Sequence, residues 1–166
     1  MPKILVAAVG NIFLGDDAFG VEVAKRLSQR ALPEGVKVVD FGIRSYDLAY
    51  ALMDEDAWDL VILVDALSRG SMPGTLYALE PELPEGGETP AEFDAHTMNP
   101  VGVLQLVAAL GGQPGRMLVL GCEPATVEPD LEGNIGLSPA VEAAADEAVG
   151  MIEELINRAR CETKAA

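Results

Sequence analysis

The chain has 166 residues, with 11 Lys and Arg against 27 Asp and Glu, and its formal net charge is −16. This length suits one domain, and it is enough to bury about two-thirds of the unfolded surface without disulfide staples. A chain this acidic repels phosphate backbones and anionic lipids, so we expect no binding to nucleic acid and none to a membrane surface.

The apolar runs and the cysteines indicate the compartment. The longest apolar runs, Ile4–Val9 and Leu60–Val64, are far shorter than the ~20 residues of a membrane span, and the first is too short for a signal-peptide core. Cys122 and Cys161 form no CxxC pair, so neither a disulfide framework nor a structural zinc site is indicated. Cys122 is expected to be a small buried hydrophobe. We therefore expect a cytoplasmic protein.

Strand and helix patterns alternate along the chain. Short apolar runs predict strands, and apolar residues at helical spacing predict helices. In chain order we predict a strand at Ile4–Val9, a helix that opens at Asp16-Asp17 and stops at Pro33, a strand at Val36–Val39, a helix at Leu48–Met53, strands at Leu60–Val64 and Thr75–Leu79, a helix over Val101–Ala108, a strand at Met117–Leu120 and a helix from Ser138-Pro139. The last helix is expected to fray from Arg160, which leaves residues 161–166 as a tail of a single domain of residues 1–160.

This alternation is typical of βαβ units. It predicts an α/β fold, a twisted and mostly parallel sheet with helices on both faces, in three layers. Thr75–Leu79 follows Leu60–Val64 through a Pro73-Gly74 turn with no helix between them, so we expect one antiparallel strand at an edge. Two segments rich in proline, glycine and acidic residues, 80–94 and 122–136, are expected to be solvated loops.

The candidate chemistry gathers where predicted strands end. Ligands of open α/β sheets bind outside the carboxyl ends of the strands, and three of those positions carry Asp17, Asp65 and His96. Two carboxylates and one imidazole would suit a divalent metal and leave coordination positions open. Structural alternatives stand beside this hypothesis: Asp16 or Asp17 could cap a helix, Asp65 could simply end a buried strand, and a lone histidine often binds nothing.

Other functional signatures are missing. The glycines of the first connection, Gly10, Gly15 and Gly20, do not form GxGxxG, and Asp16-Asp17 would repel a pyrophosphate, so a nucleotide site is not expected. The chain also has no GxxxxGK[ST], GxSxG or HExxH motif. The residues alone predict an acidic α/β domain with a candidate Asp/Asp/His site.

At those residues the chain resembles the hydrogenase maturation endopeptidases. The resemblance covers almost the whole chain and rests on GNIFLGDDAFG (10–20), VDALSRGSMPGT (64–75), the His96 segment and GCEPATVEPDLEGNIGLSP (121–139). Two places depart from the family pattern. Ala18 stands where many members have glycine, and DFGIRSYDL (40–48) stands where many have a DGGT-like stretch, which bears on the type of hydrogenase that serves as substrate.

The resemblance implies a specific activity. Such enzymes remove a short C-terminal extension from the large-subunit precursor of a [NiFe] hydrogenase after nickel has been inserted. The family's metal-contacting residues fall on Asp17, Asp65 and His96, and the ion would be the nickel of the substrate. Asp17 or Asp16 could act as a general base, or the metal could activate water. No organic cofactor is implied, and we expect a monomer.

A second hypothesis comes from another class of protein. A non-catalytic nickel-binding module or metalloprotein chaperone could use the same three residues. Such a chaperone should bind nickel tightly by itself, whereas the peptidase needs only weak binding without its substrate.

Overall fold

A computed structural model of the chain describes residues 1–53, 58–82, 100–113, 115–129, 131–132 and 135–165. Within them, one sheet has the strand order β2-β1-β3-β5-β4. Its strands are β1 (Ile4–Val9), β2 (Val36–Gly42), β3 (Leu60–Ala66), β4 (Leu76–Leu79) and β5 (Met117–Cys122). All pairs are parallel except the edge pair of β4 with β5, which is antiparallel. The predicted sheet is therefore confirmed.

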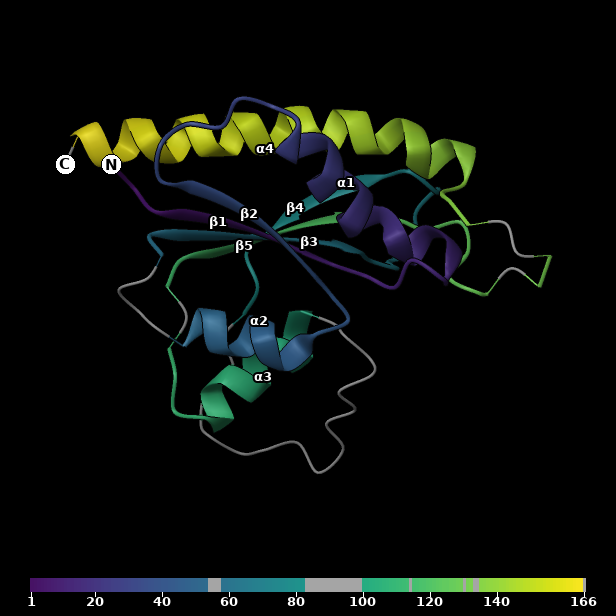
Figure 1. Cartoon of the computed structure of the whole chain (residues 1–166), viewed down its shortest axis with the longest axis horizontal. Helices are drawn as coiled ribbons and strands as arrows, with labels where there is room; N and C mark the ends of the chain where they lie inside the picture. Colours follow the sequence, from purple (N-terminus) through teal and green to yellow (C-terminus); the bar gives the residue numbers. More distant parts are fainter. Residues whose placement is uncertain (54–57, 83–99, 114, 130, 133–134, 166) are drawn as a thin grey trace.

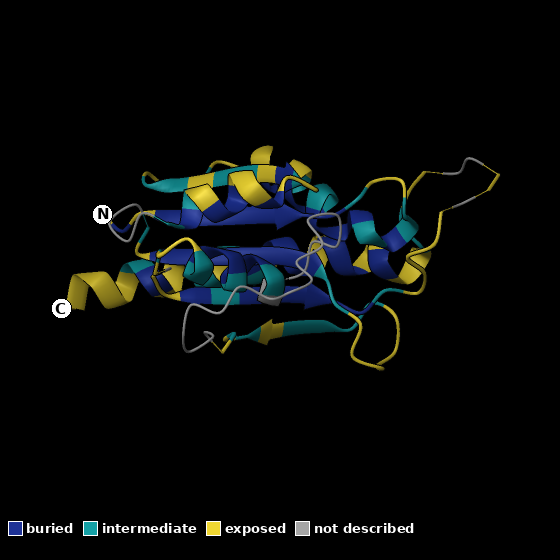
Figure 2. Ribbon diagram, turned by 90° about the horizontal axis from the view of Figure 1, so that it is seen from below, coloured by how far each residue is buried: buried dark blue, intermediate teal, exposed yellow. Residues whose placement is uncertain are grey.

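Helices cover both faces of this sheet. The short 3₁₀ helix η1 (Gly15–Ala18) leads into α1 (Phe19–Ser28), followed by α2 (Ser45–Leu52), α3 (Pro100–Ala109) and α4 (Pro139–Ala165). Figure 1 shows α1 and α4 above the sheet and α2 and α3 below it. The predicted three-layer arrangement is confirmed, and the central strands of its middle layer are dark blue, that is buried, in Figure 2.

β1 is apolar at every position because both of its faces are covered. All six residues of β1 are buried, as expected for a parallel strand between two helical layers. Ala7 pairs with Val39 of β2 and with Leu63 of β3. Alternate residues then face different helices, so the sheet separates two apolar cores.

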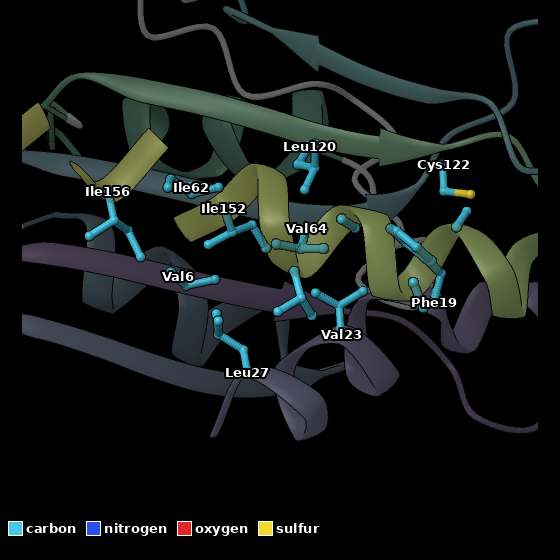
Figure 3. Close-up of a cluster of buried hydrophobic side chains, with 14 of the residues drawn as sticks. Val6, Phe19, Val23, Leu27, Ile62, Val64, Leu120, Cys122, Ile152 and Ile156 are labelled. Atoms are coloured by element: carbon cyan, nitrogen blue, oxygen red, sulfur yellow. The ribbon is translucent and has the colours of Figure 1, made fainter. Parts of the chain in front are cut away.

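The larger core lies between the sheet and the pair α1 and α4. Figure 3 shows Phe19, Val23 and Leu27 of α1 packed beside Ile152 of α4, with Val64 of β3 in the same cluster. The opposite core joins the other sheet face to α2 and α3; its most buried large side chains are Leu5, Leu48, Leu52, Leu63 and Leu104. Apolar burial of this kind supplies most of the stability of a domain.

Several predicted boundaries are shifted. The 3₁₀ helix η1 occupies the place where we predicted the first helix to open, and the α-helix begins at Phe19. β2 and β3 extend to Gly42 and Ala66, and α2 begins at Ser45, ahead of the predicted start at Leu48. Most of the predicted loop 80–94 lies outside the described residues.

The C-terminal helix is longer than predicted. α4 continues to Ala165, so residues 161–165 are helical and the expectation of a frayed tail there is corrected. Arg116, just before β5, forms a 2.7 Å ion pair with Glu162, and the Thr163 hydroxyl donates to the Ala159 carbonyl at 3.1 Å. These contacts hold the last turns. Neither α4 nor any other helix in the described part of the chain is long and apolar enough to cross a membrane.

Gly20 lets α1 sit directly on two strand ends. A Cβ atom on this residue would lie 2.4 Å from the Val9 carbonyl oxygen of β1 and 2.3 Å from the Val64 carbonyl oxygen of β3. Both contacts are with backbone, which cannot move aside as a flexible side chain would. The absence of a side chain at Gly20 therefore allows the start of α1 to pack closely against the carboxyl ends of β1 and β3.

This packing predicts opposite effects for two Gly→Ala substitutions. Gly20→Ala should lower the free energy of unfolding by at least ~2 kcal/mol because the new methyl group overlaps two carbonyl groups. Gly150→Ala is the matched control, since that glycine lies in α4 and a Cβ atom there would meet nothing within 4 Å. It should raise stability by ~0.5–1 kcal/mol through helix propensity. Urea unfolding measures both, and equal effects would contradict the packing argument.

Candidate functional site

The strand order places a topological switch point, which we call the crevice, between the carboxyl ends of β1 and β3. The chain leaves β1 through α1 on one face of the sheet, and it reaches β3 through α2 on the other face. Ligands of open α/β sheets bind where the connections diverge in this way. Asp17 follows β1 in η1, and Asp65 is the sixth residue of β3. Both predicted carboxylates therefore belong to this crevice.

A tight turn at Gly10 sets the position of Asp17. Gly10 has φ +150°, and a Cβ atom there would lie 2.0 Å from the Asp17 carbonyl oxygen. η1 can thus fold back over the end of β1. The Asn11 backbone N–H then donates to the Asp17 carboxylate at 2.9 Å. Gly10 and the backbone N–H of residue 11 therefore both place this half-buried acid.

Asp65 is a buried acid beside a second acid. Asp65 is only 3% exposed. Burial, and then the negative charge of Asp17, raise the pKa of Asp65 well above its usual range, against a smaller opposing effect of a hydrogen bond with the Ala66 backbone. The crevice therefore holds two acids that repel each other, and a proton or a cation relieves that repulsion.

Asp16 has a different environment from its neighbour. It is fully buried, and its carboxylate accepts hydrogen bonds from four donors: the backbone N–H groups of Ala125 (2.8 Å), Thr126 (3.3 Å) and Ser138 (2.7 Å), and the Ser138 hydroxyl (2.9 Å). Ser138 precedes the first residue of α4. Asp16 thus ties the start of α4 and the segment after β5 to η1, while its predicted role in catalysis stays a prediction.

The third predicted ligand, His96, lies outside the described residues. It precedes α3, which begins at Pro100 on the sheet face opposite to α1. Asp65 faces that same side, because it alternates with Val64, whose side chain packs in the core under α1 and α4. Among the residues that the structure describes, no group of three His, Cys, Asp or Glu could hold a metal. The three-residue metal site therefore stays a prediction.

The sequence analysis missed a third buried acid, Glu123, which directly follows β5. Its carboxylate accepts bonds from the backbone N–H groups of Arg69 (2.7 Å) and Gly70 (3.2 Å) and from the Tyr77 hydroxyl (2.7 Å). The bond from the Arg69 backbone, followed by the one from Tyr77, holds the pKa of Glu123 below its usual range. The criterion that singled out Asp65, an acid where a buried strand ends, would also have found Glu123.

Cys122 contributes no nucleophile to this edge. It is fully buried, and burial, together with the charges of Asp16 and Glu123, raises its pKa to about 11. A thiol with this pKa is protonated at neutral pH, and the thiolate is the reactive form. The prediction that Cys122 is a buried hydrophobe is confirmed.

Exposed apolar side chains occur in the segments at the edge of the sheet that carries Asp17 and Asp65. They lie in the segments that follow β1, β2, β3 and β5: Phe13 is 65% exposed, Ile43 51%, Met72 80% and Ile135 68%. Single exposed apolar residues need no explanation, but several at one edge of a sheet suit a surface that contacts another protein.

Comparison with known proteins gives consistent matches. Residues 21–155 match the family model described as hydrogenase maturation protease. A hydrogenase 2 maturation protease from Escherichia coli is 35% identical over 156 residues, which is 90% of this chain and 88% of that protein. A putative hydrogenase maturation protease from Methanocaldococcus jannaschii is 34% identical over 151 residues, 90% of this chain and 93% of the relative.

Solved structures agree with these sequence matches. The hydrogenase maturating endopeptidase HybD from E. coli superposes with a TM-score of 0.72 at 31% identity, covering 94% of this chain and 93% of that one. A hydrogenase 2 maturation peptidase from a Thaumarchaeota archaeon gives a TM-score of 0.69 at 33% identity, covering 93% and 98%.

The two adjacent acids should respond differently to the same substitution. In Asp16→Asn, an amide NH₂ replaces one oxygen that accepts hydrogen bonds, and we expect a loss of ~2–3 kcal/mol in the free energy of unfolding. Asp17→Asn keeps an oxygen for the Asn11 N–H and removes the repulsion with Asp65, so its stability should stay within ~0.5 kcal/mol of the wild type or rise. Chemical denaturation compares them, and an equal loss in both would contradict the structural role of Asp16.

The raised pKa of Asp65 predicts a stability change that depends on pH. A raised pKa favours the folded state below the ordinary carboxyl pKa of ~3.9, and this contribution is lost as the pH rises through the folded-state pKa. In metal-free buffer, Asp65→Asn should therefore be more stable than the wild type at pH 7, and this advantage should shrink toward pH 4. Urea unfolding across this pH range tests it; a variant less stable than the wild type at pH 7 would refute it.

Proposed function

Since the chain belongs to the hydrogenase maturation protease family, we propose that it removes the C-terminal extension of a nickel-loaded [NiFe] hydrogenase large-subunit precursor. The family consists of endopeptidases, which are hydrolases, and it acts on precursors of hydrogenase subunits. The C-terminal position of the cleaved segment and the requirement for nickel are the parts that we propose.

The pair of Asp17 and Asp65 supports this proposal most directly. Two carboxylates that repel each other at one crevice attract a cation, and burial at Asp65 strengthens that attraction. We propose that the cation is the nickel of the precursor, contacted by Asp17, Asp65 and His96. The metal would then be part of the substrate, and recognition of it would ensure that only a loaded precursor is cut.

Asp16 and Asp17 differ in their suitability as the general base. A general base must lie within hydrogen-bond reach of the proton that it removes. Within the described residues, Asp17 is half-buried and has one backbone donor on its carboxylate, whereas Asp16 is fully buried with four donors on it. We therefore assign the base to Asp17. The exposed apolar side chains at this edge of the sheet would contact the precursor, and no organic cofactor is required for hydrolysis.

We further propose that the protein acts in the cytoplasm as a monomer. Cys122 and Cys161 are both free, which suits a reducing compartment. A net charge of −16 opposes self-association through electrostatic repulsion. The alternative of a non-catalytic nickel-binding module has less support, because the two relatives and two solved structures described above carry the names of proteases, peptidases or endopeptidases.

Intact mass spectrometry of a large-subunit precursor tests the proposed function. Nickel-loaded and nickel-free precursor would each be incubated with the wild-type protein. We expect loss of a short C-terminal peptide from the nickel-loaded form alone. Asp17→Asn and His96→Ala should slow this cleavage by at least ~10²-fold, and circular dichroism should show that both variants remain folded.

Three outcomes would count against the proposal. Cleavage of the nickel-free precursor at the same rate would contradict recognition of nickel. Full activity of both variants would refute the assigned residues. Absence of any cleavage, together with tight nickel binding by the protein alone, would favour the chaperone.

A further inference from the structure

Arg69 is an unusual cation at the acidic edge of the sheet. The segments that follow the strands at this edge are residues 10–18, 43–44, 67–75 and 123–138. Their basic residues are Arg44 and Arg69. Arg44 is engaged locally: it pairs with Asp47 at 3.3 Å and donates to the Asp40 and Phe41 carbonyls. Arg69 forms no ion pair with the carboxylates of the described residues. Its guanidinium lies 5.5 Å from the centre of the Tyr77 ring.

The backbone that carries Arg69 is firmly held. The Leu67 N–H donates to the Cys122 carbonyl at 2.8 Å, and the Gly74 N–H donates to the Glu123 carbonyl at 2.8 Å. Between these two bonds, the buried Glu123 carboxylate accepts the N–H of Arg69 itself at 2.7 Å. The loop 67–74 is therefore anchored at both ends and at the residue in question.

The Tyr77 ring is the platform under the Arg69 guanidinium, and it is also held in place. The Tyr77 hydroxyl donates to the Glu123 carboxylate at 2.7 Å, so one acid orients both the ring and the Arg69 backbone. Stacking of a guanidinium on an aromatic face restricts its freedom and keeps its N–H groups available at the edge of the stack. Arg69 is thus oriented in advance, with no ion pair to a described carboxylate, in a chain with 27 acidic residues and 11 basic ones.

Sheet register places this platform beside the candidate catalytic edge. Asp65 of β3 and Tyr77 of β4 both pair with Gly121 of β5, and side chains of directly paired residues lie on the same face of a sheet. Two strand spacings separate Asp65 from Tyr77, a distance of roughly 10 Å. Gly121 adds no side chain between them, and the Leu67 side chain packs over Gly121 on this face, so a peptide that joins the two positions would pass over Leu67. An extended peptide of about three residues spans that distance.

We propose that Arg69 is a substrate-binding residue whose guanidinium binds a carboxylate of the precursor polypeptide, and that Glu123 and Tyr77 position it. This inference rests on the proposed function. The carboxylate is either an acidic side chain near the cleavage site or the free carboxyl terminus of the extension. Such a bond would be charge-assisted and suited to two parallel N–H···O contacts. It would also offset the repulsion that the acidic edge imposes on an acidic group of the substrate.

Steady-state cleavage of the nickel-loaded precursor tests the role of Arg69. Arg69→Gln should raise KM by about tenfold or more, the effect of losing one charge-assisted hydrogen bond, and should change kcat little. Arg69→Lys should recover part of the affinity. Arg30→Gln is the matched control, because Arg30 is an exposed arginine just beyond α1, and it removes the same charge away from the crevice.

Two substrate variants distinguish the sources of the carboxylate. In one, each acidic residue near the cleavage site is replaced by its amide; in the other, two residues added to the extension displace the terminal carboxylate. The variant that lacks the true partner should be cleaved equally well by Arg69→Gln and wild type, which is the coupling expected in a double-mutant cycle. Tyr77→Leu should raise KM in the wild-type background and have no further effect on KM in Arg69→Gln.

The results separate this inference from the proposed function. If the wild type fails to cleave the precursor, the proposed function is wrong. If the wild type cleaves it and Arg69→Gln retains the wild-type KM, or Arg30→Gln raises KM equally, Arg69 does not bind the substrate. Coupling with neither substrate variant would also overturn the inference.

Discussion

The buried carboxylate of Asp16 joins η1 to two segments that lie more than a hundred positions later in the sequence. Its four donors belong to residues 125, 126 and 138, more than a hundred positions away along the chain. A buried charge is tolerated only where hydrogen bonds replace the lost water, so these donors and Asp16 require one another. The turn that carries Asp17, the segment after β5 and the start of α4 are consequently fixed as one unit.

The edge of the sheet beside this turn also holds an acid, Asp65, whose charged form lowers the stability of the folded chain. Asp16 has a full set of donors, whereas Asp65, buried nearby, has a pKa raised by burial and by the charge of Asp17. Natural domains keep such unfavourable groups where chemistry needs them and compensate with well-packed surroundings. Here the compensation comes from the apolar core under α1 and α4 and from the close packing of Gly20 against β1 and β3.

Most of the fold could be predicted from local sequence pattern. Ile4–Val9 was predicted at its observed limits because a fully buried parallel strand is apolar throughout. The end of α4 could not be predicted, because the contact of Arg116 with Glu162 joins residues that are distant in sequence. For the candidate site, strand ends predicted that Asp17 and Asp65 share one edge of the sheet, and the charge of Asp17 does act on Asp65. The different environments of Asp16 and Asp17 depend on which donors the folded chain brings to each, and no pattern of adjacent residues contains that information.

Cys122 adds a consequence for the choice of metal at this edge. Thiolates are soft ligands that favour copper(I), zinc and iron–sulfur clusters, whereas carboxylates are hard oxygen donors. Cys122 is fully buried in the core under α1 and α4, and its pKa is raised to about 11. Within the described part of the chain, the carboxylates of Asp17 and Asp65 are therefore hard oxygen donors at this edge, while the Cys122 thiol is packed away from solvent on the other face of the sheet.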